Sequence, residues 1–246
     1  MSAEIDRNIH PDDAMWQPSE RWYFRVGRSA LRLVKLAEQA SGLGRIGSLL
    51  DLPCGHGRVA RHLRAAYPDA ELHFCDINTG GADYCAQAFR GHAIHSQPEL
   101  THVDLPPVDL IWVGSLFTHV DLDRTRRWLH HLCARLNPGG VLVATLHGPW
   151  SQRMHEAHYP MIDPASWQRI LAGYHATGYG YAPYADSAMG DYGISLSKPE
   201  AIIGLVREIP GVRLAGYFER GWADNHDVVM IAKQDRDRPW TPDFPV

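Results

Sequence analysis

The stretch IGSLLDLPCGHG, residues 46–57, decides the fold. Its first six residues, ending at Asp51, form a short apolar run that predicts a buried strand. The proline and the two glycines that follow predict a turn. From Arg58 to Tyr67, apolar residues recur at helical spacing, which predicts a helix. A strand, a glycine turn and a helix in this order are typical of one unit of a parallel α/β sheet.

The chain on either side continues this alternation. Further strands are predicted at residues 71–76, 92–95, 108–113 and 141–146, with helices at 81–89 and 122–136. Asn137-Pro138-Gly139-Gly140 is expected to end the second of these helices. Ser197 to Glu200 matches a capping box with Ser197 as N-cap, opening a helix to about Glu208. Closely spaced strands at 212–218 and 228–233 then indicate an antiparallel pair, so the fold class is α/β with a doubly wound, mostly parallel sheet.

The length of 246 residues fits one large domain. We expect residues 1–45 to form an N-terminal helical segment or cap, with an amphipathic helix at about 29–39. Residues 46–246 then form the main domain. Within it, residues 147–196 break the alternation and are rich in aromatic side chains, which predicts an inserted aromatic lid.

Composition excludes several classes of protein. The net charge is −4 and no basic tract occurs, so nucleic acid is not an expected partner. Without a long apolar run or a secretion signal, we expect a cytoplasmic protein that does not enter a membrane. The four cysteines lack C-x-x-C spacing, and His155-Glu156-Ala157-His158 lacks the spacing of zinc hydrolases, so no metal site is expected. The sequence does not predict the oligomeric state.

The glycine turn indicates an adenosine-containing ligand. Gly55 and Gly57 let a ligand approach the backbone at the start of a helix. Asp76, at the end of the second strand, stands where a carboxylate accepts the ribose hydroxyl groups. Residues 55–60 also fit a looser dinucleotide pattern, so a nicotinamide enzyme is an alternative. Asp51 argues against it, because a carboxylate there repels a pyrophosphate and attracts an ammonium or sulfonium group.

Taken together, these segments resemble the class I S-adenosylmethionine-dependent methyltransferases. Residues 51–57 resemble the family's first motif and Asp76 its acidic second motif. Asp109 to Val113 and residues 137–140 resemble its fourth and fifth strand regions. The resemblance implies a seven-stranded sheet with an antiparallel last strand, and S-adenosylmethionine lying over the ends of the first, second and fourth strands. One departure is Pro53, which stands where the family usually has its first glycine.

The candidate site follows from this resemblance and from the turn. Because proline lacks an N–H, the methionine end of the cofactor is expected to be held by Cys54, Gly55 and side chains. Tyr23 is a candidate to cover the cofactor, although core packing explains it equally well. Arg58 either pairs with the methionine carboxylate or is exposed. The complete set of expected cofactor-binding residues is Tyr23, Asp51, Pro53, Cys54, Gly55, Gly57, Asp76, Ile77 and Ser115.

Two histidines are candidates for a general base. His119 follows the fourth strand and His147 follows the fifth, and both loops face the ligand crevice of an open α/β sheet. An imidazole is well matched to proton transfer near neutral pH. A structural hydrogen bond is the alternative for each, and His226 is expected to lie in a solvated turn.

The expected function is methyl transfer to a hydroxyl group, less readily an amine, of a small metabolite such as a sugar or a secondary-metabolite intermediate. The aromatic lid favours a small acceptor, because its rings stack on flat substrates and exclude water. A cofactor-binding module without catalysis and a nicotinamide-dependent oxidoreductase are the alternatives.

Overall fold

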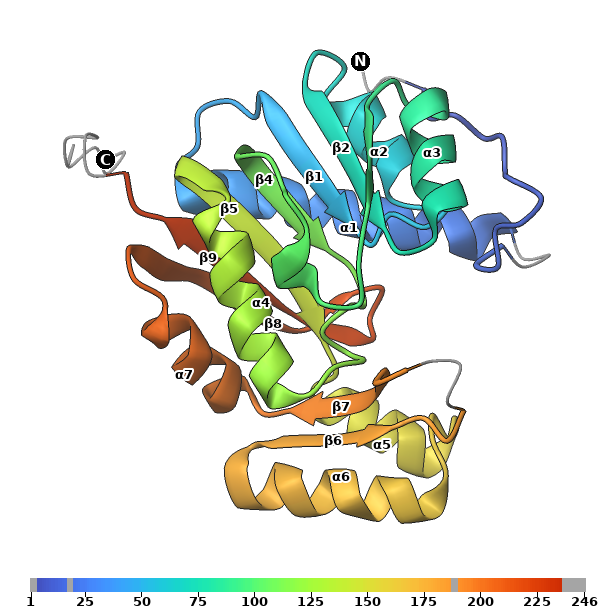
Figure 1. Cartoon of the computed structure of the whole chain (residues 1–246), viewed down its shortest axis with the longest axis vertical. Helices are drawn as coiled ribbons and strands as arrows, with labels where there is room; N and C mark the ends of the chain where they lie inside the picture. The colour runs from blue at the N-terminus through green and yellow to red at the C-terminus, as the bar shows by residue number, and fades with distance from the viewer. Residues whose placement is uncertain (1–3, 17–19, 187–189, 236–246) are drawn as a thin grey trace.

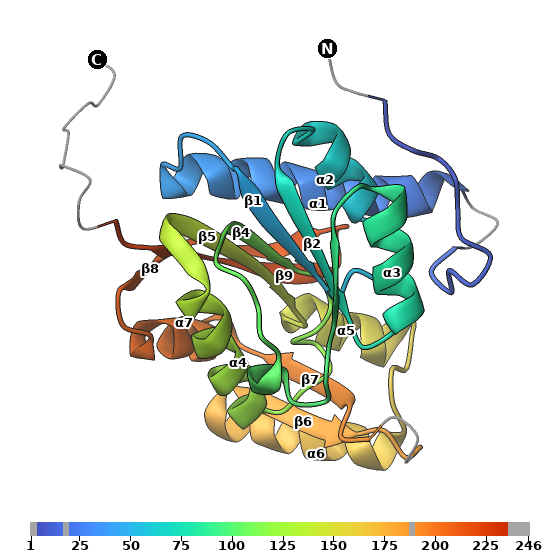
Figure 2. The ribbon, with the colours of Figure 1, turned by 45° about the horizontal axis from the view of Figure 1, so that its top comes forward.

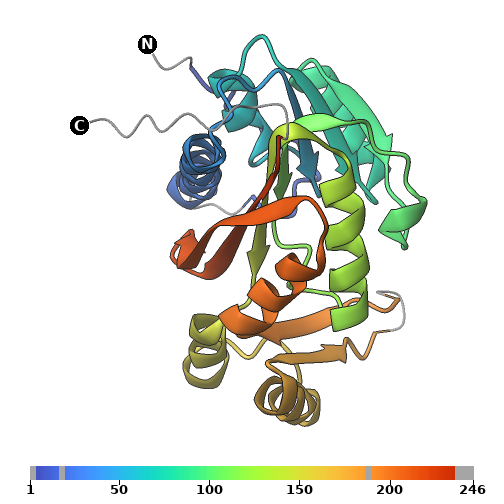
Figure 3. The ribbon, with the colours of Figure 1, turned by 90° about the vertical axis from the view of Figure 1, so that its left-hand side faces the viewer.

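The computed structural model describes residues 4–16, 20–186 and 190–235. Among the described residues, each helix is too short or too polar to cross a membrane. The three rotated views agree on two parts, a large central sheet flanked by helices and a smaller unit below it (Figures 1, 2 and 3).

A seven-stranded sheet in the order β3-β2-β1-β4-β5-β9-β8 forms the centre of the molecule (Figure 1). The pairs among β3, β2, β1, β4 and β5 are parallel, whereas β9 runs antiparallel to both β5 and β8. The predicted doubly wound sheet with its antiparallel last strand is therefore confirmed. The strand bounds are β1 Ser48–Leu52, β2 Glu71–Asp76, β3 His92–His95, β4 Val108–Val113, β5 Leu136–Leu146, β8 Val212–Trp222 and β9 His226–Lys233.

Helices cover both faces of this sheet (Figure 3). One face packs against α1, α2 and α3, and the other against α4 and α7. Alternate residues of β1 serve the two faces, since Leu49 belongs to one core cluster and Leu50 to the other. The helix bounds are α1 Glu20–Ser41, α2 Ala60–Ala66, α3 Thr79–Ala88, η1 Leu100–His102, α4 Leu122–Ala134 and α7 Pro199–Glu208.

The segment between β5 and α7 folds into a unit with its own small core. It contains α5 (Pro149–Ala157), α6 (Pro164–Thr177), β6 (Tyr179–Pro183) and β7 (Gly193–Ser197). α6 lies against the β6–β7 pair (Figure 2), and Trp167, Ile170 and Leu196 are among the buried residues between them. We call this unit, residues 147–196, the insertion.

Backbone hydrogen bonds join the insertion to the central sheet. The N–H groups of Gly193, Ser195 and Ser197 donate to the carbonyls of His119, Thr118 and His147, respectively. One edge of β7 is therefore paired with β6, and the other with the loops that follow β4 and β5.

The predicted boundaries are wrong at several element ends. Ser197 is not an N-cap, because its N–H and its hydroxyl both donate to the His147 carbonyl, and Lys198 takes the cap position without a side-chain bond. Residues 137–140 do not end α4, which stops at Ala134, but lie inside β5 beside a register shift. The sequence predicts each segment from its neighbours in the chain. In the structure, hydrogen bonds to distant residues determine both: Ser197 bonds to His147, and β5 pairs with β4.

The first two helices also differ from prediction. α1 begins at Glu20 rather than near residue 29, and the apolar positions Val26, Ala30 and Leu33 lie in one core cluster. α2 begins at Ala60, which leaves Arg58 in the turn before it.

Candidate functional site

A cavity of about 480 Å³ lies where β1, β2 and β4 end, between the glycine turn and the insertion. We call it the first cavity. The sequence-predicted residues that line it are Pro53, Cys54, Gly55, Asp76, Ile77, Ser115 and His119. Asp51, Gly57, Tyr23 and His147 lie outside its lining, and each is described below.

Gly55 leaves room for a ligand at the turn. Its φ of +51° is a left-handed conformation, and a Cβ atom added there would have nothing within 4 Å. Its N–H donates to Oδ2 of Asp76 at 2.7 Å, and the Cys54 N–H donates to the Cys75 carbonyl at 3.1 Å. Both amides are therefore bonded within the protein in this structure, and the role of Cys54 and Gly55 in holding the methionine end of the cofactor stays a prediction.

Gly57 is explained by packing rather than by the ligand. Its φ is +86°, and an added Cβ atom would lie 2.3 Å from Cε2 of the buried Phe89. A side chain at this position would collide with the ring that anchors α3, so the second glycine lets the turn pack closely on the helix.

Asp51 lies buried at the end of β1, just before the glycine turn. Its side chain is 1% exposed, and neither carboxylate oxygen has a hydrogen-bond partner among the described residues. Burial raises the pKa of Asp51 well above its usual value, nearby Asp76 adds to this, and Arg58 opposes it. Arg58 lines the first cavity, with its guanidinium 5.7 Å from the Trp222 ring centre. The site thus holds a buried acid that lacks a counter-charge in contact.

Asp76 faces the cavity from the end of β2. Oδ1 accepts from the Asn78 N–H at 2.8 Å and Oδ2 from the Gly55 N–H, so both oxygens are held in place. Each carboxylate oxygen has a further lone pair for a ligand hydroxyl. The next residue, Ile77, is 53% exposed and places an apolar side chain on the cavity lining.

Tyr23 does not cover the cavity. It is 2% exposed, and its hydroxyl donates to Oδ2 of Asp13 at 2.5 Å while Arg61 donates to it at 3.4 Å. Burial is the main cause that raises the pKa of the phenol, so it stays protonated at neutral pH. Asp13 does line the cavity, and Tyr23 therefore acts by holding a lining residue in position.

His119 presents one defined face to the cavity. Its Nδ1 lies 2.9 Å from the Gly193 carbonyl, which can only accept, so Nδ1 carries the proton. The Tyr184 hydroxyl lies 3.1 Å from the same nitrogen. Burial lowers the pKa of His119, and the Gly193 bond partly offsets this. The ring is neutral at pH 7, and the unprotonated Nε2 is left to accept a proton.

His147 and His226 extend this site away from the first cavity. The ring centres of His119 and His147 are 6.3 Å apart, and those of His147 and His226 are 5.0 Å apart. His147 donates from Nδ1 to the Ser195 carbonyl at 3.1 Å, and burial lowers its pKa well below the usual value. His226 is not in a solvated turn as expected: it begins β9, and burial lowers its pKa to about 3.

Ser115 lies in the loop after β4 with φ +61°. Its N–H donates to Oγ1 of Thr145 at 2.7 Å, and its hydroxyl is 3.1 Å from that of Thr118. These bonds fix the loop that carries His119 against β5.

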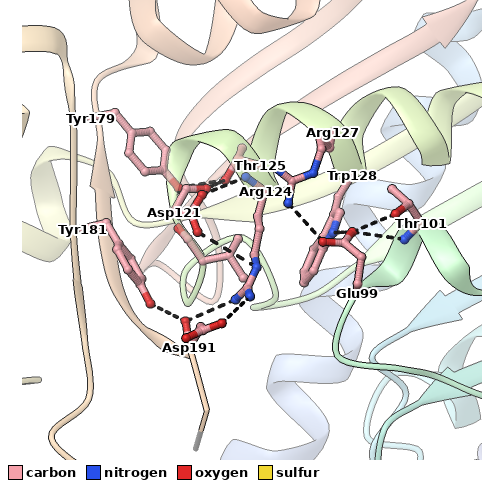
Figure 4. A network of polar contacts seen from close by, with 11 residues as sticks. Glu99, Thr101, Asp121, Arg124, Thr125, Arg127, Trp128, Tyr179, Tyr181 and Asp191 are labelled. Carbon is pink, nitrogen blue, oxygen red and sulfur yellow. Dashed lines mark hydrogen bonds and ion pairs between the residues drawn. The ribbon is translucent and has the colours of Figure 1, made fainter.

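A polar network fastens the insertion to α4 (Figure 4). Nη2 of Arg124 donates to Oδ2 of Asp191 at 2.6 Å, and the Tyr181 hydroxyl bonds to the Asp191 carbonyl. The hydroxyls of Thr125 and Tyr179 lie 2.8 Å apart. Asp191 directly precedes the segment that meets His119, so this network sets the position of the residues over the cavity.

Glu99 holds a second wall of the cavity (Figure 4). Its Oε1 accepts from Nε1 of Trp128 at 2.5 Å and from the Thr101 hydroxyl at 2.9 Å. Its Oε2 accepts from Nη2 of Arg127 at 3.0 Å. Trp128 lines the first cavity, and its ring is therefore locked by the carboxylate.

Sequence reasoning missed several cavity residues. Trp112 and Trp222 meet edge to face at 5.4 Å, and Tyr184 and Tyr192 of the insertion also line the cavity. The tyrosines lie in the segment that the sequence marks as an aromatic lid. No local pattern signals Trp222, which reaches the site because Nε1 donates to the Val26 carbonyl of α1.

The His155–His158 segment is not arranged for a metal. The His155 ring stacks on Trp167 at 3.6 Å, and its Nδ1 accepts from the Met161 N–H at 2.9 Å. The part of the chain that the structure describes holds no group of three His, Cys, Asp or Glu side chains placed for an ion.

The first cavity fits the sulfonium cofactor that the resemblance implies. The orphaned Asp51 carboxylate suits an ammonium or sulfonium charge, Arg58 suits a carboxylate, and Asp76 suits ribose hydroxyls. The open space at Gly55 admits a ligand close to the backbone. A pyrophosphate bound at the glycine turn would lie near Asp51, which disfavours the nicotinamide alternative.

Comparison with known proteins agrees with this assignment. Residues 50–142 match the family model described as a methyltransferase domain. No curated protein matches the sequence.

Several solved structures share the fold. An O-methyltransferase family protein from Burkholderia thailandensis is 18% identical, with a TM-score of 0.53 over 90% of this chain and 64% of that chain. The amino pentose methyltransferase CalS10 from Micromonospora echinaspora, bound to S-adenosylmethionine, is 17% identical, with a TM-score of 0.56 over 92% of this chain and 100% of that chain. A Pyrococcus horikoshii protein is 12% identical, with a TM-score of 0.57 over 92% and 96% of the two chains. The chain thus spans less than two thirds of the Burkholderia protein, and identities this low show a common fold alone.

Proposed function

We propose that this chain, whose residues 50–142 match a methyltransferase domain, is a class I S-adenosylmethionine-dependent methyltransferase that methylates a hydroxyl group, or as a second choice an amine, of a small metabolite such as a sugar or a secondary-metabolite intermediate. The observation that carries the proposal is His119, whose single unprotonated nitrogen belongs to a ring that lines the first cavity. We further propose that residues 1–45 form a cap, that residues 46–246 form the catalytic domain, and that the insertion acts as its aromatic lid.

Different residues at the first cavity bind different parts of the cofactor. When bound, S-adenosylmethionine supplies an electrophilic methyl group on a positively charged sulfur. Asp76 holds the ribose and Arg58 pairs with the methionine carboxylate, while Asp51, buried next to the cavity, stabilises the cationic end in its ionised form. The side chains of Ile77 and Trp128 give apolar surface for the adenine ring.

His119 acts on the acceptor. A hydroxyl group becomes a competent nucleophile when its proton is removed, and the neutral Nε2 accepts that proton. The Gly193 carbonyl keeps the proton on Nδ1, which fixes the tautomer and stabilises the imidazolium that forms. His147 is the second candidate base. It lies outside the first cavity, and its ring packs next to that of His119.

The acceptor is proposed to be small because aromatic rings enclose the cavity. Tyr184 and Tyr192 cover it from the insertion, and such rings stack on flat molecules and exclude water. CalS10 is described as an amino pentose methyltransferase, and the Burkholderia protein as an O-methyltransferase, which supports acceptors of this kind.

Two measurements test the proposal. Isothermal titration calorimetry should detect binding of S-adenosylmethionine and S-adenosylhomocysteine but not of NADH. Incubation with labelled S-adenosylmethionine and a metabolite extract should yield a labelled small molecule together with S-adenosylhomocysteine. Binding without any labelled product would identify a non-catalytic module, and NADH binding in place of the sulfonium compound would overturn the family-based reasoning.

The role of His119 is tested by His119→Asn. This variant should keep cofactor affinity and slow methyl transfer by about 100-fold, in line with the usual contribution of general-base catalysis. The wild-type rate should stay flat from alkaline pH to below 6.5 and then fall as the histidine protonates, because its pKa is lowered. His175→Asn, an exposed position on α6, is the matched control and should leave the rate unchanged.

A further inference from the structure

A second cavity of about 820 Å³ lies between α1, α5 and the turn at residues 223–225. Its lining includes three arginines of α1, namely Arg25, Arg28 and Arg32. We call it the arginine cavity. Residues three and four positions apart share one face of a helix, so these guanidinium groups point to the same side of α1.

Within the described part of the chain, the three arginines have no acidic partner. All three are exposed, and among the described residues no carboxylate lies within ion-pair distance of any of them. On the same helix, by contrast, Lys35 pairs with Glu38 at 2.9 Å. Asp224, the acid in the cavity lining, is bonded to Arg220 at 2.7 Å instead. In a chain of net charge −4, this is a concentration of uncompensated positive charge.

The rest of the lining is suited to a ring-bearing molecule. Trp22, Trp150 and Tyr159 line the cavity, and the Trp150 ring is held by the Arg220 guanidinium 3.8 Å from its centre. Ser151 also belongs to the lining, is 2% exposed, and has a hydroxyl without a hydrogen-bond partner among the described residues. A buried unpaired hydroxyl is costly, so this group indicates a missing polar partner.

The arginine cavity adjoins the proposed catalytic site. His147 lines it, and the His147 ring lies 6.3 Å from that of His119, which lines the first cavity. The two cavities also share one turn, since Trp222 lines the first and Ala223 lines the second. His147 and the turn at residues 222–223 therefore lie at the boundary between the two cavities.

We propose that the arginine cavity binds the anionic end of the methyl acceptor, and that this acceptor carries a carboxylate or a phosphate monoester on a ring-bearing body. The inference rests on the proposed function, because it names the acceptor of that same reaction. Arginine donates paired N–H groups that match either oxyanion, and the aromatic residues contact the body of the molecule. The acceptor hydroxyl group then extends toward His119.

Binding is tested with phenyl phosphate and benzoate, which separate the two oxyanion sources. Calorimetry on the wild-type chain should show binding of at least one probe, weakening as salt is added. The double variant Arg28→Gln/Arg32→Gln should weaken binding of the preferred probe about tenfold or more. All three arginines are exposed, so these variants should fold normally. Arg45→Gln removes the same charge at an exposed site outside both cavities and serves as the control.

Unchanged affinity in the double variant, or an equal loss in Arg45→Gln, would overturn the anion site. Its failure is distinguishable from failure of the proposed function, because S-adenosylmethionine binding is measured in the same samples. The acceptor assignment has its own test, in which a metabolite extract is separated on an anion-exchange resin before the methylation assay. The labelled product should arise from the retained fraction, and a product that arises only from the unretained fraction would refute the assignment.

Discussion

Replacement of Glu99 by Gln tests how the wall of the first cavity is held. The carboxylate accepts hydrogen bonds from Trp128, Arg127 and Thr101. Glutamine keeps one acceptor oxygen but turns the other position into a donor, which faces the Arg127 guanidinium. We expect a less stable protein and a less firmly held Trp128 ring.

The magnitude follows from the carboxyl group itself. Burial acts to raise its pKa, but the hydrogen bonds from Trp128, Arg127 and Thr101 outweigh burial and lower the pKa from 4.5 to about 2. At 1.36 kcal/mol per pKa unit this corresponds to about 3 kcal/mol. The Glu99 side chain is 25% exposed and that of Arg127 is 51% exposed, so solvent screening reduces the expected loss to about 1–2 kcal/mol.

The stabilisation that Glu99 provides should depend on pH. A carboxylate whose pKa is lowered on folding stabilises the protein above its unfolded pKa, and this stabilisation is lost as the pH falls toward the folded value. The difference between wild type and Glu99→Gln should therefore be full at pH 7 and shrink steadily between about pH 4.5 and pH 2.

Urea unfolding followed by tryptophan fluorescence measures both quantities. Curves for wild type and Glu99→Gln at pH 7 and pH 3 give the two free energies of unfolding. Glu219→Gln, an exposed change on β8, is the control and should alter stability by less than about 0.5 kcal/mol. A difference that is the same at both pH values, or absent at pH 7, would refute the reasoning.

Three other substitutions test separate parts of the site. Gly57→Ala should destabilise the fold by about 2–4 kcal/mol in urea unfolding, because its φ is positive and the new Cβ atom meets Phe89. Asp76→Asn should weaken S-adenosylmethionine binding at least about tenfold in calorimetry, since the amide accepts ribose hydroxyls less well than a carboxylate and its NH2 group faces a backbone N–H whose hydrogen bond the carboxylate accepts. Arg124→Gln breaks the ion pair with Asp191 and should raise the KM of the methyl acceptor more than it lowers kcat, with unfolding free energy changed by less than about 1 kcal/mol.

The central sheet could be predicted from the sequence because its signals are local. The strands at His92–His95 and Val108–Val113 were predicted with the bounds that the structure shows. A strand such as Val108–Val113, buried on both faces of a parallel sheet, is visible as a short apolar run without tertiary information, whereas His92–His95 is an edge strand with exposed ends and carries a weaker signal. Ends that depend on distant partners were missed, as at Ser197, whose hydroxyl bonds to the His147 carbonyl rather than to its own helix.

The candidate site divides in the same way. Gly55 and Asp76 could be found because the turn and the following strand place them by chain order alone. Gly57 and Tyr23 carry signals of the same kind, but the structure gives them packing and positioning roles. The partner of His119 lies 74 residues away in β7, and no local pattern predicts that pairing.

One edge of β7 both joins the insertion to the central sheet and orients two histidines. Alternate carbonyls of a strand point the same way, and those of Gly193 and Ser195 accept from Nδ1 of His119 and His147, respectively. A shift of one residue would turn both carbonyls away and leave both histidines without their acceptors. The insertion and the proposed base are therefore coupled through the register of one strand. An insertion exchanged for another would keep the His119 tautomer only if the new strand offers carbonyls in the same register.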